Sequence, residues 1–323
     1  MSFFSRLPAL AVSLLLPSVA FAQQDIRVPE PQYVIISFDG ASFIEQWQRS
    51  RALAERTGAH FTYFLSCVYL LTRETRDAYD APGVKSARSN VGYGQSREEV
   101  QQRLGQIWQA RNDGHEIASH GCGHFNGSAW SVADWKQEFD AFQSILRNAW
   151  EINGIDGKPQ EWHAFAESEI IGFRAPYLST NENLFHALAD QGLRYDASTV
   201  SSGPERPVDR NGVIRFSLPL IPEGPAEKRL IAMDYNLYVR HSGGQERPEE
   251  SGTFEQRAYN AFLAAFEREY NGSRTPLQLG FHFTLMNDGA YWRALERFAE
   301  KVCVQADVRC VSYREYLDRA ASG

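Results

Sequence analysis

The segment GHEIASHGCGH, residues 114–124, joins a short apolar run to a glycine-rich loop that carries two histidines four positions apart. Its first half predicts a buried strand, and the loop then places His120 and His124 just beyond the end of that strand. Two neutral imidazoles suit a Zn, Ni, Co or Fe ion, and the glycines let the backbone bend around such an ion. A loop whose histidines form only hydrogen bonds is the simpler alternative, so the other strands must decide between the two.

Strands and helices alternate along most of the chain, which predicts parallel strands joined by helical crossovers. The run YVIISFD, residues 33–39, is rich in β-branched residues, as is typical of a strand that is covered on both faces, and it ends at Asp39. Ser42 with Glu45 fits a capping box, which predicts a helix from that point to about Arg56. The expected architecture is an α/β barrel in a single domain.

Polar residues gather at the ends of the predicted strands. In α/β barrels the carboxyl ends of the strands form the active site. The residues that lie at or just beyond such ends are Asp39, His120, His124, Arg174, Asp234 and His282. The sequence therefore predicts one site that several strands build together.

These residue types indicate hydrolysis assisted by a metal ion. The ion would activate a water molecule, a carboxylate would take the proton of that water, and a separate histidine would protonate the leaving group. Asp39 and His282 are the candidates for these two roles; Arg174 would keep Asp39 ionised, and Asp234 would orient His282 or pair with Arg174. Structural roles stay open: Asp39 as a helix cap, Arg174 with Asp234 as an ion pair, and His282 as a core histidine.

Composition argues against a nucleic-acid partner. The 323 residues carry a formal net charge of −7, and no run of Lys or Arg forms a local basic patch.

Residues 70–95 hold few apolar positions and several turn-forming residues, which predicts an inserted loop.

The first 22 residues resemble a secretory signal peptide that ends in a small-residue cleavage pattern, Ala-Phe-Ala. Pro8 and Pro17 interrupt its apolar part, which is shorter than the roughly 20 residues of a membrane span. We expect residues 23–323 to form the mature domain, without a membrane span, in the periplasm or outside the cell.

Export predicts that the four cysteines are oxidised. Cys303 and Cys310 are the favoured pair because they lie close in sequence, and Cys67 pairs with Cys122 if their strands are neighbours. Cys122 as a soft metal ligand stays open as well.

These motifs, taken in order, resemble the polysaccharide deacetylases of carbohydrate esterase family four, the NodB type, from Tyr33 to about Tyr313. The segments that carry the resemblance are SFDGA (37–41), GHEIASHGCGH (114–124), RAPY (174–177), Asp234 for the weak fourth motif, and LGFH (279–282).

The resemblance implies a deformed (β/α) barrel that removes N-acetyl groups from an N-acetylhexosamine polysaccharide, such as chitin oligomers, peptidoglycan or exopolysaccharide. It implies a divalent ion, Zn or alternatively Co or Ni. The implied roles are Asp39 as general base, His120 and His124 as metal ligands, His282 as general acid, Arg174 as the partner of Asp39, and the backbone N–H of Tyr177 as an oxyanion donor.

One departure concerns the metal. In the family the second aspartate of the first motif is the third ligand, whereas this chain has Gly40. Asp288 and Cys122 are the candidates to replace it. A catalytically impaired carbohydrate-binding protein of the same fold is therefore a further hypothesis. An amidase that acts on a small C–N substrate is another, since related folds host such chemistry. The oligomeric state is not predicted.

Overall fold

The computed structural model describes residues 1–3 and 30–320. Apart from its first three residues, the predicted signal peptide lies outside the described residues. Contacts divide the chain into Met1–Glu30 and Pro31–Gly323, and the second unit holds the sheet and helices. None of the helices in the described ranges is long and apolar enough to cross a membrane.

A ten-stranded, mostly parallel sheet forms the centre of the second unit. The two antiparallel partners are β6 and β8, which both pair with β7. The strands are β1 (Gln32–Gly40), β2 (Thr62–Leu65), β3 (Glu116–Ser119), β4 (Gly172–Phe173), β5 (Tyr195–Ser201), β6 (Val208–Arg210), β7 (Val213–Glu223), β8 (Lys228–Ile231), β9 (Leu277–His282) and β10 (Val308–Val311).

Strand β1 organises the sheet because it has three parallel partners. Its first half pairs with β10 and its second half with β2, while β9 runs along its other edge. The ring closes beyond β8, where Gly280 N donates to Ala232 O at 2.9 Å and Met233 bridges to Gly280. The predicted deformed (β/α) barrel is therefore confirmed.

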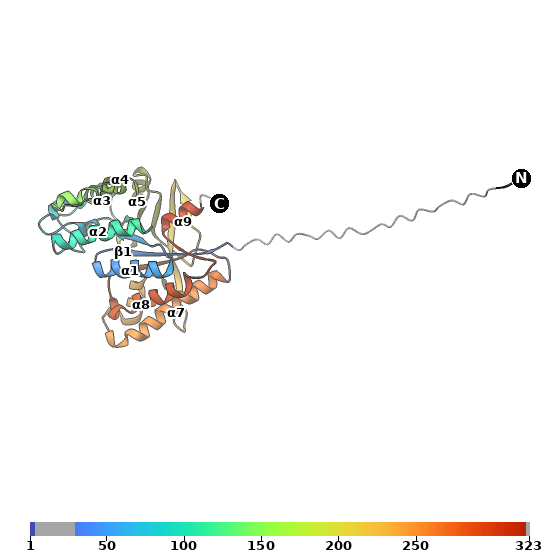
Figure 1. Cartoon of the computed structure of the whole chain (residues 1–323). Coiled ribbons are helices and arrows are strands. Elements are labelled where there is room, and N and C mark those ends of the chain that lie inside the picture. The colour runs from blue at the N-terminus through green and yellow to red at the C-terminus, as the bar shows by residue number, and fades with distance from the viewer. Residues whose placement is uncertain (4–29, 321–323) are drawn as a thin grey trace. The chain divides into compact units, whose positions relative to one another are not determined.

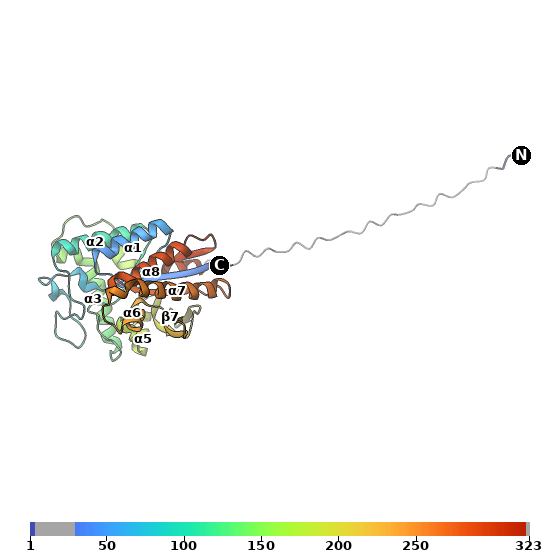
Figure 2. The same cartoon turned by 90° about the horizontal axis from the view of Figure 1, so that it is seen from below.

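The helices surround these strands. Helices α2 to α5 lie on one side of the strands, and α7 and α8 lie on the opposite side (Figure 1). Figure 2 shows α7 beside α8, with which it packs. The helices are α1 (Ile44–Thr57), α2 (Arg97–Asn112), α3 (Val132–Ile152), α4 (Trp162–Ser168), α5 (Glu182–Asp190), α6 (Asp234–Ser242), α7 (Ser251–Tyr270), α8 (Met286–Val302) and α9 (Tyr313–Ala320), with short 3-10 turns η1 (Cys67–Leu70), η2 (Arg76–Ala78), η3 (Pro176–Leu178) and η4 (Pro248–Glu250).

The capping box predicted for Ser42 and Glu45 is wrong. Helix α1 begins at Ile44, and its N-cap residue Phe43 makes no side-chain cap bond. Gly40 and Ala41 have φ angles of 86° and 54°, so the chain turns in the left-handed region before the helix begins. The carbonyl of Ser42 instead accepts a bond from buried Arg103 at 2.6 Å.

The barrel interior is a compact, largely aromatic cluster that is separate from the layer between strands and helices. Its members come from six strands and from the start of α9. They are Ile35, Phe64, Ala118, Tyr195, Ala197, Phe216, Val311 and Tyr313, joined by Tyr316 and Leu317.

Two disulfides join the four cysteines, as predicted: Cys67 with Cys122, and Cys303 with Cys310. The first forms because β2 and β3 are neighbouring strands, so the turns that follow them meet. Cys122 is therefore not a free thiolate, and the hypothesis that it binds a metal ion is wrong.

Removing the Cys67–Cys122 bond should destabilise the fold more than removing Cys303–Cys310. The two bonds span 55 and 7 residues, and loop entropy assigns them about 4 and about 2 kcal/mol. Urea unfolding of the two double Cys→Ala variants measures the difference. Equal losses would contradict the entropic ordering.

Candidate active site

Side-chain alternation along the strands directs the predicted residues into the barrel. On β1, Ile36 and Phe38 belong to the outer layer beneath the helices, whereas Ile35 belongs to the interior cluster. A period of two then turns Asp39 inward at the end of the strand. The same parity on β9, where Phe281 packs outward, turns His282 inward.

Strands β3 and β4 deliver the other two inward groups. Ala118 packs inside the barrel, so His120 two positions later faces the same way. Phe173 packs outward beneath helices α3 and α5, so Arg174 points in. Residue 172 must be glycine, because a Cβ there would lie 1.9 Å from the ring of Tyr195, which crosses the interior.

The inward groups meet at a cavity of about 650 Å³ at the carboxyl ends of the strands. Five of the predicted residues line it, and Arg174 and Asp234 lie behind its wall, in contact with two of them. The lining residues are Asp39, Gly40, Ser42, Tyr69, Val91, His120, His124, Ala175, Tyr177, Leu178, Ile231, Met233, Tyr235, Asn236, Tyr238, His282, Phe283, Thr284 and Met286.

Arg174 is fully buried and holds Asp39. Its Nη1 donates to Asp39 Oδ1 and to Ser37 Oγ, both at 2.8 Å. Burial by itself raises the pKa of Asp39, but the charge of Arg174, helped by His120 and His282, outweighs it and lowers the pKa below its usual value. Asp39 is therefore an ionised carboxylate at neutral pH.

Asp234 holds His282 from the opposite side of the cavity. Asp234 is the first residue of α6, and its carboxylate accepts hydrogen bonds from His282 Nδ1–H at 2.7 Å and from the His282 backbone N–H at 2.8 Å. Burial lowers the pKa of His282, but attraction to Asp234 outweighs it and raises the pKa above its usual value. The predicted alternative in which Asp234 pairs with Arg174 is wrong, because both Asp234 oxygens serve His282.

His120 and His124 form the candidate metal centre, with ring centroids 5.0 Å apart. His120 Nδ1 lies 2.8 Å from the carbonyl of Arg174. A carbonyl only accepts, so Nδ1 carries the proton and Nε2 keeps its lone pair. His124 Nδ1 is buried without a hydrogen-bond partner. Burial lowers the pKa of both rings, that of His124 to about 3, so both are neutral.

These two imidazoles could bind a divalent ion whose remaining coordination positions are filled by water. In the described part of the chain, no group of three His, Cys, Asp or Glu side chains is arranged to hold an ion. Asp288, a predicted substitute ligand, is exposed and does not line the cavity. Opposite Gly40 stands the ring of Tyr69, 3.9 Å from where a Cβ on Gly40 would lie.

Tyr177 lies at the cavity rim on η3. Its backbone is left-handed, with φ of 58°, and its side chain is 58% exposed. The ring packs edge-on against His124, with centroids 4.6 Å apart. Such a conformation is rare for an aromatic residue, and strained backbone of this kind concentrates at functional sites.

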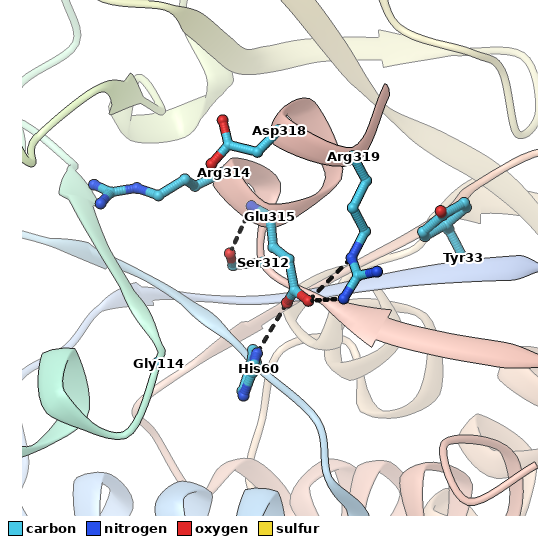
Figure 3. A pocket seen from close by; sticks show the side chains of 8 residues that line it. All are labelled: Tyr33, His60, Gly114, Ser312, Arg314, Glu315, Asp318 and Arg319. Carbon is cyan, nitrogen blue, oxygen red and sulfur yellow. Dashed lines mark hydrogen bonds and ion pairs between the residues drawn. The ribbon is translucent and has the colours of Figure 1, made fainter. Parts of the chain in front are cut away.

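A second hollow lies at the other end of the barrel, beside the residues that precede β2 and β3 (Figure 3). His60 and Arg319 both pair with Glu315 there, and Arg314 binds the carbonyl of Glu169. These charged groups form ion pairs with one another or hydrogen bonds to the backbone, so we interpret the hollow as a structural ion-pair cluster.

Several contributors to the site were not predicted. Ser37 lies two positions before Asp39, so the two-residue period of a strand could have placed it on the same face as Asp39. Tyr313 OH accepts from Arg174 Nη2 at 2.8 Å and donates to Gln278 Oε1 at 3.0 Å. No sequence signal pointed to Tyr313, because it reaches the site from the far end of the chain.

Comparison with solved structures identifies the fold. A protein assigned as a polysaccharide deacetylase from Mycobacterium smegmatis aligns with a TM-score of 0.56 at 16% identity, covering 91% of this chain and 92% of that one. One from Pseudomonas aeruginosa PAO1 gives 0.52 at 16% identity, covering 89% of each. PuuE allantoinase gives 0.53 at 14% identity, covering 95% and 98%. The chain thus has the NodB-type barrel of its polysaccharide deacetylase neighbours. No family model and no curated protein matches the sequence.

Replacing Arg174 by Met should cost about 3–5 kcal/mol of unfolding free energy at neutral pH, because the Asp39 carboxylate stays buried without its partner. Urea unfolding measures this loss. The double variant Asp39→Asn/Arg174→Met should recover part of it, since it removes both charges.

The loss should shrink in acid. A lowered pKa means that Asp39 contributes stability above 3.8, its ordinary value, and that this contribution disappears as the pH falls through the lower folded value. A loss that is independent of pH would show that Arg174 acts through packing alone.

Proposed function

We propose that the chain is an exported, metal-assisted hydrolase that removes N-acetyl groups from an N-acetylhexosamine-containing polysaccharide. The observation that carries the proposal is the pair of opposed groups across one cavity: Asp39 with a lowered pKa and His282 with a raised one. Two titratable groups whose pKa values are pushed apart suit a base and an acid. The fold shared with proteins assigned as polysaccharide deacetylases supports the substrate class.

Asp39 is the proposed general base. It takes a proton from the water whose oxygen bonds to the acetyl carbonyl carbon. Arg174 keeps Asp39 ionised for this step, because protonation would leave the buried guanidinium without its counter-charge. Ser37 and Tyr313 hold the guanidinium in place, so the carboxylate keeps its position.

His282 is the proposed general acid. The Nδ1–H bond to Asp234 fixes the ring, so the proton on Nε2 faces the cavity and passes to the amine nitrogen as the C–N bond breaks. Acetate and the free amine leave; of the two protons that the water has lost, one restores the charge of His282 and the other passes to solvent, so both residues return to their starting states. The backbone N–H of Tyr177 is the proposed donor to the developing oxyanion, a contribution worth about 10²–10³ in rate.

His120 and His124 would hold the divalent ion, Zn or alternatively Co or Ni. When bound, the ion supplies a Lewis acid that polarises the carbonyl and lowers the pKa of the attacking water. The protein keeps both rings neutral and fixes the tautomer of His120 through the Arg174 carbonyl.

A second candidate is hydrolysis of a small amide. The apolar and aromatic wall of a cavity sized for a small molecule favours it. PuuE allantoinase shares the fold. Substrate size separates the two candidates.

Acetate release from N-acetylglucosamine oligomers, peptidoglycan and exopolysaccharide tests the proposal, with Zn or Co added and with chelator. We expect metal-dependent release that falls at least about 100-fold in His282→Ala and Asp39→Asn. Turnover of small amides alone would support the second candidate. Glycan binding without acetate release would identify a carbohydrate-binding protein instead.

Gly40→Asp should tighten Zn binding, because it adds a carboxylate beside two imidazoles. The backbone at Gly40 has φ of 86°, so any side chain there is strained and should cost about 1 kcal/mol of stability. Gly40→Asn is the matched control, since it carries the same strain without the charge. Calorimetric titration with Zn compares them, and equal affinities would refute the missing-ligand explanation.

A further inference from the structure

The loop that carries the two imidazoles has its backbone tied residue by residue. Gly121 N donates to Ser119 Oγ at 3.2 Å, and its carbonyl accepts from Cys67 N at 3.1 Å. Cys122 N donates to Glu138 Oε1 at 2.6 Å. These bonds run to three separate elements, so the loop conformation is imposed from outside.

Tyr79 and Glu138 form the centre of this set of contacts. Tyr79 OH accepts from Gly123 N at 3.0 Å and donates to Glu138 Oε2 at 2.8 Å. Both side chains are buried, with 0% and 2% exposure. Neither lines the cavity, so the pair reaches the loop from behind.

Close approach of this pair explains the glycines of the motif. A Cβ on Gly121 would lie 2.9 Å from Glu138 Oε1, and one on Gly123 would lie 2.7 Å from Tyr79 Cε1. Real Cβ atoms do not come that close to other heavy atoms. Phe125 Cε2 lies closer still to the Gly123 position, at 2.5 Å, and Gly121 has φ of 67°, so the two glycines make room for Glu138, Tyr79 and Phe125 in a turn that favours glycine.

Asn90 holds the same loop from its outer side, and we call Tyr79, Glu138 and Asn90 together the clamp. Its backbone N–H donates to Gly123 O at 2.8 Å, and its Nδ2 donates to His124 O at 3.1 Å. His124 is left-handed, with φ of 55°, a conformation that the bond to its carbonyl helps to hold. Tyr79 and Asn90 both belong to the inserted segment, residues 70–95, which therefore reaches the imidazole pair.

We propose that Tyr79 and Glu138, assisted by Asn90, are positioning residues that fix the His120–His124 loop so that the two imidazoles converge. The assignment rests on the proposed function, in which that pair holds the metal ion. It gives the inserted segment a role in metal binding as well as in shaping the cavity.

Tyr79→Phe tests the proposal, with Tyr63→Phe as the matched control. Tyr63 is also fully buried and bonds through its hydroxyl, to Ser50 Oγ at 2.9 Å, but it does not touch the loop. Each variant is compared with wild type for Zn affinity, thermal stability and hydrogen exchange of the Cys122 and Gly123 amides. Asn90→Ala, at an exposed position, is the milder variant that should fold in any case.

Tyr79→Phe should weaken Zn binding about 10–100-fold and speed exchange of the two amides at least about tenfold. Tyr63→Phe should change neither, even where it lowers the melting temperature by the same amount. Asn90→Ala should weaken Zn binding by less than Tyr79→Phe does. Equal Zn affinities in the two Tyr→Phe variants, or unchanged amide exchange in Tyr79→Phe, would overturn the proposal.

The readouts separate this proposal from the proposed function. If the wild type binds Zn but releases no acetate, the proposed deacetylase function is wrong. The Zn affinities of the variants then still decide whether the clamp positions the imidazoles. If the wild type binds no Zn, the metal-assisted reaction fails, and the exchange rates and their dependence on Tyr79 decide whether the clamp orders the loop.

Discussion

The buried guanidinium of Arg174 is the group on which the site depends. It binds Ser37 and Asp39 from β1, Ala197 O from β5 and Tyr313 OH from the start of α9, and it packs over the Phe64 ring at 4.3 Å. Its own carbonyl sets the tautomer of His120. A planar group with five donors suits this task, because lysine offers neither the fork geometry nor a flat face. One residue therefore links the candidate base to the candidate metal centre.

On both sides of the cavity, each buried charged side chain is paired with one of opposite charge. Arg174 neutralises Asp39, and Asp234 supports His282, so each buried charge has a hydrogen-bonded partner. Such pairs add little net stability, since desolvation offsets much of their attraction. Their effect is to push two pKa values in opposite directions. That separation is what an acid and a base in one cavity require.

The metal centre is the less regular part of the site. Two neutral imidazoles converge, yet Gly40 supplies no carboxylate, and the Tyr69 ring stands opposite it. The loop that presents the imidazoles is braced by a disulfide, by Glu138 and by the inserted segment. A site with few protein ligands depends more heavily on the correct orientation of those it has. The extent of the bracing is consistent with that need.

The sequence alone determined the alternation of strands and helices and the presence of Asp39, His120, Arg174 and His282 at strand ends, and it favoured the pairing of Cys303 with Cys310. These features follow from local periodicity and spacing, which a chain carries along its length. Only the tertiary structure decided that Asp234 serves His282 rather than Arg174, that Cys122 pairs with Cys67 rather than binding a metal ion, and that Tyr313, Tyr79 and Glu138 support the site. Each of these depends on contacts between residues far apart in sequence. The physical reason is that barrel closure brings such residues together, and no local pattern encodes which of them will meet.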